Sequence, residues 1–194
     1  MTIYGLTGGI ACGKTTLGEM MRAQGWTLVD SDAIAHKLME PGEVNWKKVV
    51  DAFGDKILNS DRTINRRALG DLVFSQPALR QQLNTLTHPA IREVWQGEMN
   101  RFPDSRPQQP MVVIIPLLFE CSLQKEFDAV ICVACSAATQ WRRLLARGLS
   151  EVQTRQRLAS QWPLPEKMNQ SQSVIWNEGS LECLRRQFQE LTRA

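Results

Sequence analysis

The sequence predicts an α/β fold, a doubly wound, parallel, five-stranded sheet with helices on both faces. Short apolar segments of strand length alternate with longer segments whose apolar residues recur at helical spacing. Two segments, Val112–Ile115 and Ala129–Val133, are continuously apolar, which is typical of parallel strands buried on both faces. The middle of the chain has only helical patterns, so we expect it to form a helical cap.

The amino-terminal part is expected to alternate between strands and helices. The expected elements are strand Ile3–Thr7, helix Lys14–Gln24, strand Thr27–Asp30 and helix Asp32–Met39. Gly25 and Pro41–Gly42 suit the ends of the two helices. Either Ser31 or Asp32 is a good N-cap for the second helix.

Helical patterns follow, and then strands and helices alternate again. The expected helices of the middle section are Val44–Phe53, Arg66–Phe74 and a segment from Gln76 towards Phe102. Ser75 suits the N-cap of the third helix, whereas Pro89 favours an extended conformation for His88 before it. A polar segment with three prolines, Pro103–Pro110, closes this section. Beyond it we expect strands Val112–Ile115, Ala129–Val133 and Ser173–Trp176 and helices Ala137–Arg147, Glu151–Gln161 and Leu181–Thr192.

Length and composition indicate one folded domain. We expect a core (about 1–40, 110–140 and 170–194), a cap (about 41–109) and a lid (about 141–169) within the 194 residues. With 43% hydrophobic and 22% charged residues, the chain is neither collagen-like, coiled-coil nor disordered. A net charge of +3 is too small for a global nucleic-acid footprint. The apolar run Met111–Phe119 is too short to span a membrane and no secretory signal is visible, so a cytoplasmic protein is expected.

The cysteines favour a structural role. Their number, five, is odd, which argues against a disulfide framework. Cys132 and Cys135 form a C-x-x-C pattern, but it lies in an apolar run of strand length without a second Cys or His pair nearby. We therefore expect buried thiols there rather than a redox or zinc site.

The motif that carries chemistry follows the first expected strand. Gly8–Thr15 satisfies G-x-x-x-x-G-K-[S/T] and precedes the first expected helix, which is the context of a phosphate-binding P-loop. Backbone N–H groups and the helix N-terminus would hold phosphates, Lys14 would reach the β- and γ-phosphates, and the Thr15 hydroxyl would bind Mg²⁺. The residues expected to bind the nucleotide here are Gly8, Gly9, Ile10, Ala11, Cys12, Gly13, Lys14, Thr15 and Thr16.

Other motifs narrow the class of nucleotide-binding protein. An N-K-x-D motif is absent, and Asp51–Gly54 matches D-x-x-G only inside a helical pattern, so a GTPase is disfavoured. The strand Val112–Ile115 runs into Pro116 instead of the acid that many ATPases carry. Asp30 and Asp32 are the nearest acids at a strand end, where ligands gather in α/β sheets. Either one suits a role in polarising an acceptor hydroxyl or in holding Mg²⁺ through water.

An ordered series of motifs extends along most of the chain and resembles the dephospho-CoA kinase family. The matching segments are Leu6–Ile10, Lys14–Thr15, Asp30–Ala35, Asp61–Leu69, Val73–Phe74, His88–Pro89, Pro116–Glu120, Gln140, Arg143, Arg147, Gln161, Lys167 and Ile175–Asn177. The resemblance implies transfer of a phosphoryl group from ATP to the ribose 3′-hydroxyl of dephospho-CoA. It also implies that the helical middle section binds the CoA part of the acceptor.

Particular roles follow from the same resemblance. Asp32 and Lys14 would be catalytic, with Asp32 as general base on the 3′-hydroxyl. The ATP site would include Arg143 and Arg147 on phosphates and Asn177 on the adenine. The acceptor site would include Asp32, Arg66, His88, Leu117 and Glu120.

Charge is concentrated locally where a lid is expected. The segment Arg142–Arg157 has five arginines and a single acid, Glu151. Guanidinium groups bind phosphate oxygens in a forked geometry and stay charged, so the segment suits a lid over phosphates. A solvated helix face is the alternative explanation.

The chain departs from the family pattern inside the loop. Ala11–Cys12 stands where Gly-Ser is usual, and Ala11 is tolerated there if its φ is negative. Lys14 and the helix end are expected to lower the pKa of the Cys12 thiol, which gives the hypothesis that oxidation inactivates the protein. His36 stands where Arg is common.

The fold and the P-loop alone do not determine which molecule accepts the phosphoryl group. A nucleoside or nucleotide kinase of the same fold therefore stays open, and so does a non-catalytic module in which ATP orders the lid. An acid at the position of Asp32 favours an enzyme, because a pure binder has no use for it. The oligomeric state does not follow from these residues.

Overall fold

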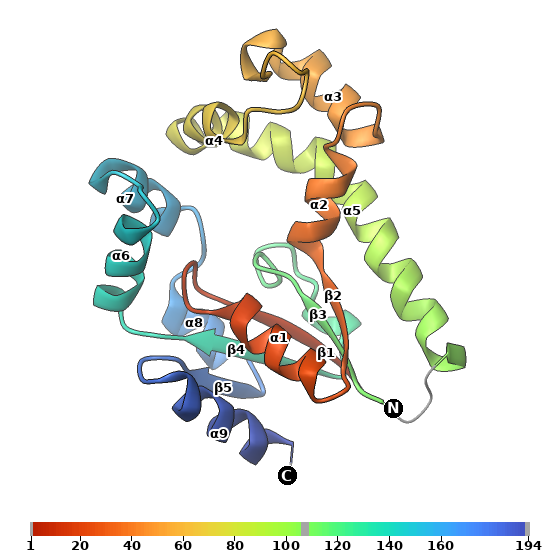
Figure 1. Cartoon of the computed structure of the whole chain (residues 1–194), viewed down its shortest axis with the longest axis vertical. Coiled ribbons are helices and arrows are strands. Elements are labelled where there is room, and N and C mark those ends of the chain that lie inside the picture. The colour runs from red at the N-terminus through yellow and green to blue at the C-terminus, as the bar shows by residue number, and fades with distance from the viewer. Residues whose placement is uncertain (1, 106–108, 193–194) are drawn as a thin grey trace. The chain divides into compact units, whose positions relative to one another are not determined.

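A computed structural model of the chain describes residues 2–105 and 109–192 (Figure 1). One sheet has the strand order β2-β3-β1-β4-β5. Its strands are β1 (Ile3–Gly8), β2 (Thr27–Asp30), β3 (Met111–Ile114), β4 (Ala129–Ala134) and β5 (Ser173–Trp176). Leu6 in β1 pairs in parallel with Ile114 on one side and Ile131 on the other. The predicted five-stranded parallel sheet flanked by helices is confirmed.

The sheet is buried, as its apolar strands predicted. All four residues of β3 and five of the six in β4 are buried. One face packs against α1 (Lys14–Ala23) and α9 (Leu181–Leu191). Its core includes Leu6, Leu17, Met21, Val112, Ile114, Ile131, Val133, Ile175, Leu184 and Phe188. This packing holds β1 and α1 in place, and the P-loop connects those two elements.

The chain folds into two compact units, Met1–Val29 with Arg101–Ala194, and Asp30–Asn100. The second unit has its own core, formed by Val49, Phe53, Ile57, Ile64, Leu69 and Val73. Its elements are α2 (Ser31–Leu38), α3 (Val44–Phe53), η1 (Asp55–Ile57), α4 (Arg66–Ser75) and most of α5 (Pro77–Ser105). The finer division into core, cap and lid stays a prediction.

The first unit carries further helices after β3. They are η2 (Gln124–Glu126), α6 (Ala137–Ala146), α7 (Glu151–Ala159) and α8 (Leu164–Asn169). The sequence patterns missed α8, because its six residues are too few to show helical periodicity. Within the described ranges, no helix has the length and apolar character needed to cross a membrane.

The N-cap of α2 differs from the prediction. We expected Ser31 or Asp32, but α2 begins at Ser31 and its N-cap is Asp30. The Asp30 backbone is extended, at φ −115° and ψ 112°, and its Oδ1 accepts hydrogen bonds from Asp32 N (2.8 Å) and Ala33 N (3.4 Å). The helix therefore starts directly at the end of β2, one residue earlier than expected.

The long helix α5 also differs from the prediction. Ser75 ends α4, where its hydroxyl donates to Leu72 O, so it is not the cap of α5. His88 is helical despite Pro89, because the bias imposed by a following proline is a preference that a long packed helix overrides. The backbone stays helical to Ser105, three residues into the predicted polar segment. Residues 106–108 of that segment lie outside the described residues.

Candidate active site

The P-loop connects β1 to α1 through backbone that only some residues adopt easily. Gly8 and Gly13 have φ of 139° and 102°, and a Cβ on Gly8 would lie 2.0 Å from Val133 O. Ala11 has φ 60°, so the negative φ that would make an alanine easily tolerated at this position is not present. Left-handed residues among right-handed ones turn successive N–H groups to one side, which makes an anion-binding nest. In the loop of this chain the positive φ values belong to two glycines, Gly8 and Gly13, and to Ala11, which suits a nest of this kind.

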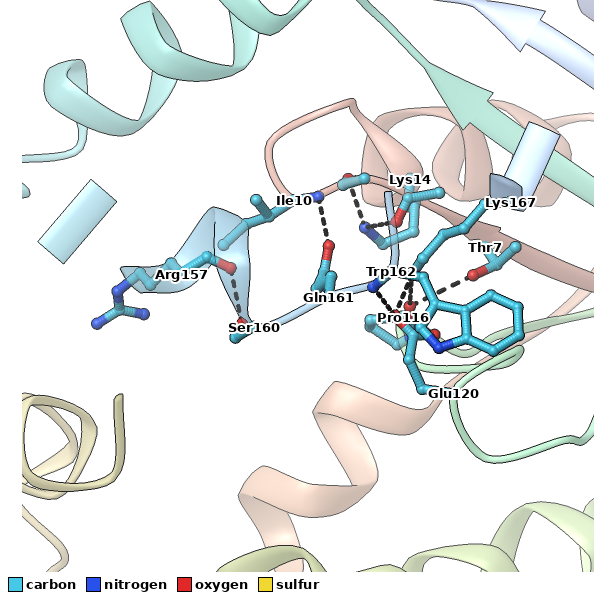
Figure 2. A network of polar contacts seen from close by, with 12 residues as sticks. Thr7, Ile10, Lys14, Pro116, Glu120, Arg157, Ser160, Gln161, Trp162 and Lys167 are labelled. Atoms are coloured by element: carbon cyan, nitrogen blue, oxygen red, sulfur yellow. Dashed lines mark hydrogen bonds and ion pairs between the residues drawn. The ribbon is translucent and has the colours of Figure 1, made fainter. Parts of the chain in front are cut away.

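Lys14 and the start of α1 face the same loop. Lys14 Nζ donates to Gly8 O (3.2 Å) and Gly9 O (2.9 Å), as Figure 2 shows. The N-cap of α1 is Gly13, and no side-chain hydrogen bond caps the helix, whose N-terminus is a favourable position for an anion. Thr15 and Thr16 in the first turn are exposed. These groups supply the positive charge, N–H donors and hydroxyl oxygen that a polyphosphate requires.

Two predicted ATP ligands, Arg143 and Asn177, contact the backbone of the loop. Arg143 in α6 donates from Nη1 to Ala11 O (3.0 Å) and from Nη2 to Asn177 O (3.1 Å). Asn177, directly after β5, donates from Nδ2 to Cys12 O (2.8 Å). A third predicted ligand, Arg147, is the exposed C-cap residue of α6. Arg143 and Asn177 are therefore already engaged in holding the loop.

Two glutamines that were not among the predicted site residues also hold the loop. Gln140 Nε2 donates to Ile10 O (2.8 Å), and Gln161 Oε1 accepts from Ile10 N (2.9 Å; Figure 2). The sequence indicated both only through the family resemblance. The spacing of Gln140 and Arg143, three residues apart on a helix, was the available signal, because it places both on one helix face.

Glu120 forms a buried ion pair. Its Oε1 lies 2.7 Å from Lys167 Nζ and accepts from Trp162 N (2.9 Å). Lys167 Nζ donates also to Pro116 O (2.9 Å), to which Thr7 Oγ1 donates at 3.3 Å (Figure 2). Of the two Glu120 oxygens, Oε2 has no hydrogen-bond partner among the described residues. The predicted acceptor ligand therefore connects α8, and Trp162 before it, to the segment that follows β3.

The thiols differ from the reactive cysteine that was expected. Burial raises the pKa of Cys12, and this outweighs the lowering effects of Cys135 and Lys14, so the expected low pKa was wrong. Cys12 Sγ lies 3.4 Å from Cys135 Sγ. Burial also raises the pKa of Cys132 to about 11 and that of Cys135 to about 12. In the described ranges, no group of three or more His, Cys, Asp or Glu side chains suits a metal ion. These thiols have the character of packed core groups.

Within the unit Asp30–Asn100, the predicted acceptor residues lie on separate helices. Asp32 is exposed in the first turn of α2, and His36 is exposed in its last turn. Arg66 is the first, exposed residue of α4. His88 in α5 is half-buried, and burial lowers its pKa. The backbone of Asp32 is fixed at the start of α2, because its N–H donates to Asp30 Oδ1 (2.8 Å).

Two arginines of the predicted lid have partners close to them in the chain. Arg142 Nη2 donates to Thr139 Oγ1 (3.3 Å). Arg155 pairs with Glu151 (3.2 Å) and lies over the Trp141 ring. Exposed pairs of this kind are weak and exchange easily for a phosphate. A role in closing over nucleotide stays a prediction.

A parallel α/β sheet whose first strand leads through a G-x-x-x-x-G-K-T loop into a helix defines a P-loop nucleotide-binding protein. The model of the dephospho-CoA kinase family matches residues 2–182, so the chain belongs to that family. A dephospho-CoA kinase of Geobacillus kaustophilus is 41% identical over 185 residues, which cover 95% of this chain and 92% of that protein. One of Lactobacillus johnsonii is 39% identical, with 98% and 97% covered.

Solved structures agree with the family. The crystal structure of TT1252 from Thermus thermophilus aligns with a TM-score of 0.79 and 31% identity, covering 99% of this chain and 96% of that one. The dephospho-CoA kinase from Campylobacter jejuni aligns with a TM-score of 0.69 and 27% identity, with 98% and 95% covered.

Proposed function

We propose that this chain transfers the γ-phosphoryl group of ATP to the ribose 3′-hydroxyl of dephospho-CoA, giving CoA and ADP, the last step of CoA biosynthesis. The observation that carries the proposal is the loop geometry, in which the positive φ at Gly8, Ala11 and Gly13 builds a phosphate nest before an open helix N-terminus. Membership of the dephospho-CoA kinase family supports the choice of acceptor.

In this proposal the loop binds the polyphosphate and α1 stabilises its charge. Lys14, which contacts Gly8 O and Gly9 O, would turn to the transferring phosphate, where its charge stabilises the transition state. The exposed Thr15 hydroxyl is a hard oxygen ligand and fits Mg²⁺, which prefers few protein ligands together with phosphates and water. Bound Mg²⁺ would neutralise phosphate charge during transfer.

Asp32 would accept the proton of the acceptor hydroxyl. A carboxylate is too weak a base to deprotonate a sugar hydroxyl in the ground state, but it can take the proton late in a loose phosphoryl transfer. Its position depends on Asp30, which caps α2 and holds the Asp32 N–H at 2.8 Å. Orientation of this kind contributes strongly to catalysis.

The other predicted contacts complete the proposal. Arg143, Arg147 and Asn177 would serve the ATP site, and Arg66, His88, Leu117 and Glu120 the acceptor site. Glu120 would contact the acceptor through Oε2, the carboxylate oxygen that does not bind Lys167. The cytoplasmic location and the absence of a nucleic-acid partner stay predictions.

The test is an acceptor panel. Purified protein with ATP and Mg²⁺ is given dephospho-CoA, nucleosides or nucleoside monophosphates, and ADP release is measured. We expect turnover with dephospho-CoA at least roughly tenfold above the other acceptors, because recognition of a large substrate favours its transition state. Equal rates would favour a nucleotide kinase. A lack of stimulation by any acceptor would favour a nucleotide-binding module.

A further inference from the structure

Three consecutive carbonyl groups of the P-loop accept hydrogen bonds from side chains outside the loop. Gln140 donates to Ile10 O at 2.8 Å, Arg143 to Ala11 O at 3.0 Å, and Asn177 to Cys12 O at 2.8 Å. We call these three donors the carbonyl collar. Gln140 and Asn177 are each 7% exposed, so water does not readily replace them. A buried carbonyl that lost its donor would be destabilised, which makes these bonds directional restraints on the loop.

The glycines of the motif make room for the collar. A Cβ on Gly9 would lie 2.5 Å from Gln140 Nε2, and a Cβ on Gly13 would lie 2.2 Å from Asn177 Nδ2. Both distances are shorter than any ordinary contact, so a side chain at either position would displace the amide. The glycine spacing is thus matched to the two amides as well as to the phosphates.

The collar fixes the orientation of the peptide groups of the loop. Because a peptide group is planar, its C=O and its N–H point in opposite directions, so a donor that holds the C=O also orients the N–H of the next residue. Carbonyls 10–12 therefore determine where the N–H groups of Ala11, Cys12 and Gly13 point, and the N–H of Cys12 donates to Gly9 O (3.2 Å). The left-handed Ala11 lies between two of these restraints, and a left-handed alanine is strained without such support. Gln161 adds a restraint on the other side of Ile10 by accepting from its N–H (Figure 2).

We propose that Gln140, Arg143 and Asn177 are positioning residues that hold the P-loop backbone in its phosphate-binding conformation before nucleotide binds. The inference rests on the proposed use of ATP. It assigns Gln140 a role, and it makes Arg143 and Asn177 act on the nucleotide through the carbonyls of Ala11 and Cys12. A loop ordered in advance loses less entropy on binding, and its donors need no reorganisation during transfer.

Three variants test the collar. Gln140→Met and Asn177→Leu keep the approximate size of the side chain and remove the donor. Arg143→Lys keeps the positive charge but not the forked geometry that reaches two carbonyls. Gln189→Met, at an exposed glutamine of α9, is the matched control. ATP binding is measured by calorimetry without acceptor, and KM is measured separately for ATP and dephospho-CoA, with thermal unfolding as a check of folding.

Each collar variant should weaken ATP binding about tenfold and raise KM for ATP, because a buried or partly buried loop carbonyl loses its partner. KM for dephospho-CoA should stay within about twofold of the wild-type value, and Gln189→Met should change nothing. A loss of general stability would instead shift both KM values together. Gln140 and Asn177 lie on different elements, so Asn177→Leu still tests the inference if Gln140→Met does not fold.

Folded Gln140→Met and Asn177→Leu proteins that bind ATP like the wild type would overturn the inference. For Arg143, full affinity in Arg143→Lys would overturn it, since charge alone would then suffice. These results leave the proposed function intact. Conversely, ATP binding that is weakened in the collar variants, together with wild-type protein that transfers nothing to dephospho-CoA, would contradict the proposed function and retain the inference.

Discussion

Lys167 Nζ lies 2.7 Å from Glu120 Oε1, and the Lys167 side chain is fully buried while that of Glu120 is 15% exposed. Removing one partner of a buried ion pair leaves the other charge without compensation. Lys167→Met should therefore lower the free energy of unfolding by about 3–5 kcal/mol. Urea denaturation measures the change.

The exposed pair between Lys47 and Asp51 provides the control for this prediction. Its side chains are 76% and 64% exposed at an N–O distance of 3.2 Å, so Lys47→Met should cost no more than about 0.5 kcal/mol. Equal losses in the two variants would show that burial does not determine the strength of the Lys167–Glu120 pair.

At Ala11 we predict a substitution that raises the free energy of unfolding instead of lowering it. Its φ of 60° is unfavourable for a residue with a Cβ and is neutral for glycine. Ala11→Gly should raise the free energy of unfolding by about 1 kcal/mol, whereas Ala52→Gly in α3 should lower it by about 0.5–1 kcal/mol. Urea denaturation of both variants gives the comparison. A stability loss in both would mean that Ala11 is not strained.

Thiol reactivity should identify Cys183, not Cys12, as the most reactive cysteine. Cys183 is exposed, and a hydrogen bond from the Ser180 hydroxyl is the main cause that lowers its pKa. Cys12 is buried and its pKa is raised. Because the thiolate is the nucleophile, iodoacetamide near pH 8 should label Cys183 first, as peptide mass spectrometry can show.

Cys183→Ser is the control for the labelling experiment and should abolish the fast phase. In urea, all five thiols should react. Labelling of Cys12 in the folded protein as fast as that of Cys183 would contradict the prediction. It would also revive the hypothesis that oxidation of Cys12 inactivates the protein.

Glu178 predicts a specific pH dependence of stability. Its carboxylate accepts from Ser136 N (2.7 Å), Ser136 Oγ (2.8 Å) and Thr139 Oγ1 (2.5 Å) at the start of α6. These hydrogen bonds lower the pKa of Glu178 from 4.5 to about 2, and the one from Ser136 N contributes most. A lowered pKa in the folded state stabilises the protein above the unfolded value of about 4.5, and the contribution is lost as the pH falls towards about 2.

The comparison of wild type with Glu178→Gln measures this effect. The wild type should unfold at a higher urea concentration near pH 6, and the difference should shrink between about pH 4.5 and pH 3. Global acid effects are common to both proteins and cancel in the difference. A difference that stays constant with pH would show that the Glu178 charge does not stabilise α6.

Local signals in the sequence predicted the elements that carry the loop. Glycine spacing and apolar runs extend over a few residues, so β1, α1 and the parallel sheet followed from them. The Ala11 conformation did not, because it depends on donors that are distant in the chain, such as Arg143. Gln140 contacts Ile10 across 130 positions, and no local pattern encodes such a contact.

The N-cap of α2 shows a second reason why the sequence alone does not predict some features of the structure. Asp30, Ser31 and Asp32 are all good N-caps, so composition alone cannot choose among them. The choice depends on where the pairing of β2 ends, which is a property of the sheet. Since α2 begins at Ser31, Asp32 falls in the first turn, and the Asp30 side chain rather than that of Asp32 caps the helix.

This division of roles between the two aspartates leads to the prediction for catalysis. Asp32→Asn keeps the size of the side chain but cannot accept a proton, so kcat should fall by roughly 10²- to 10⁴-fold with ATP affinity retained. Asp30→Asn keeps an oxygen that can cap α2 and should retain most of the turnover. Asp51→Asn, an exposed aspartate of α3, controls for loss of charge in the same unit. The measurements are kcat with dephospho-CoA and ATP binding by calorimetry. Near-normal turnover of Asp32→Asn would refute its role as general base, and an equal loss in Asp30→Asn would assign the effect to the position of α2.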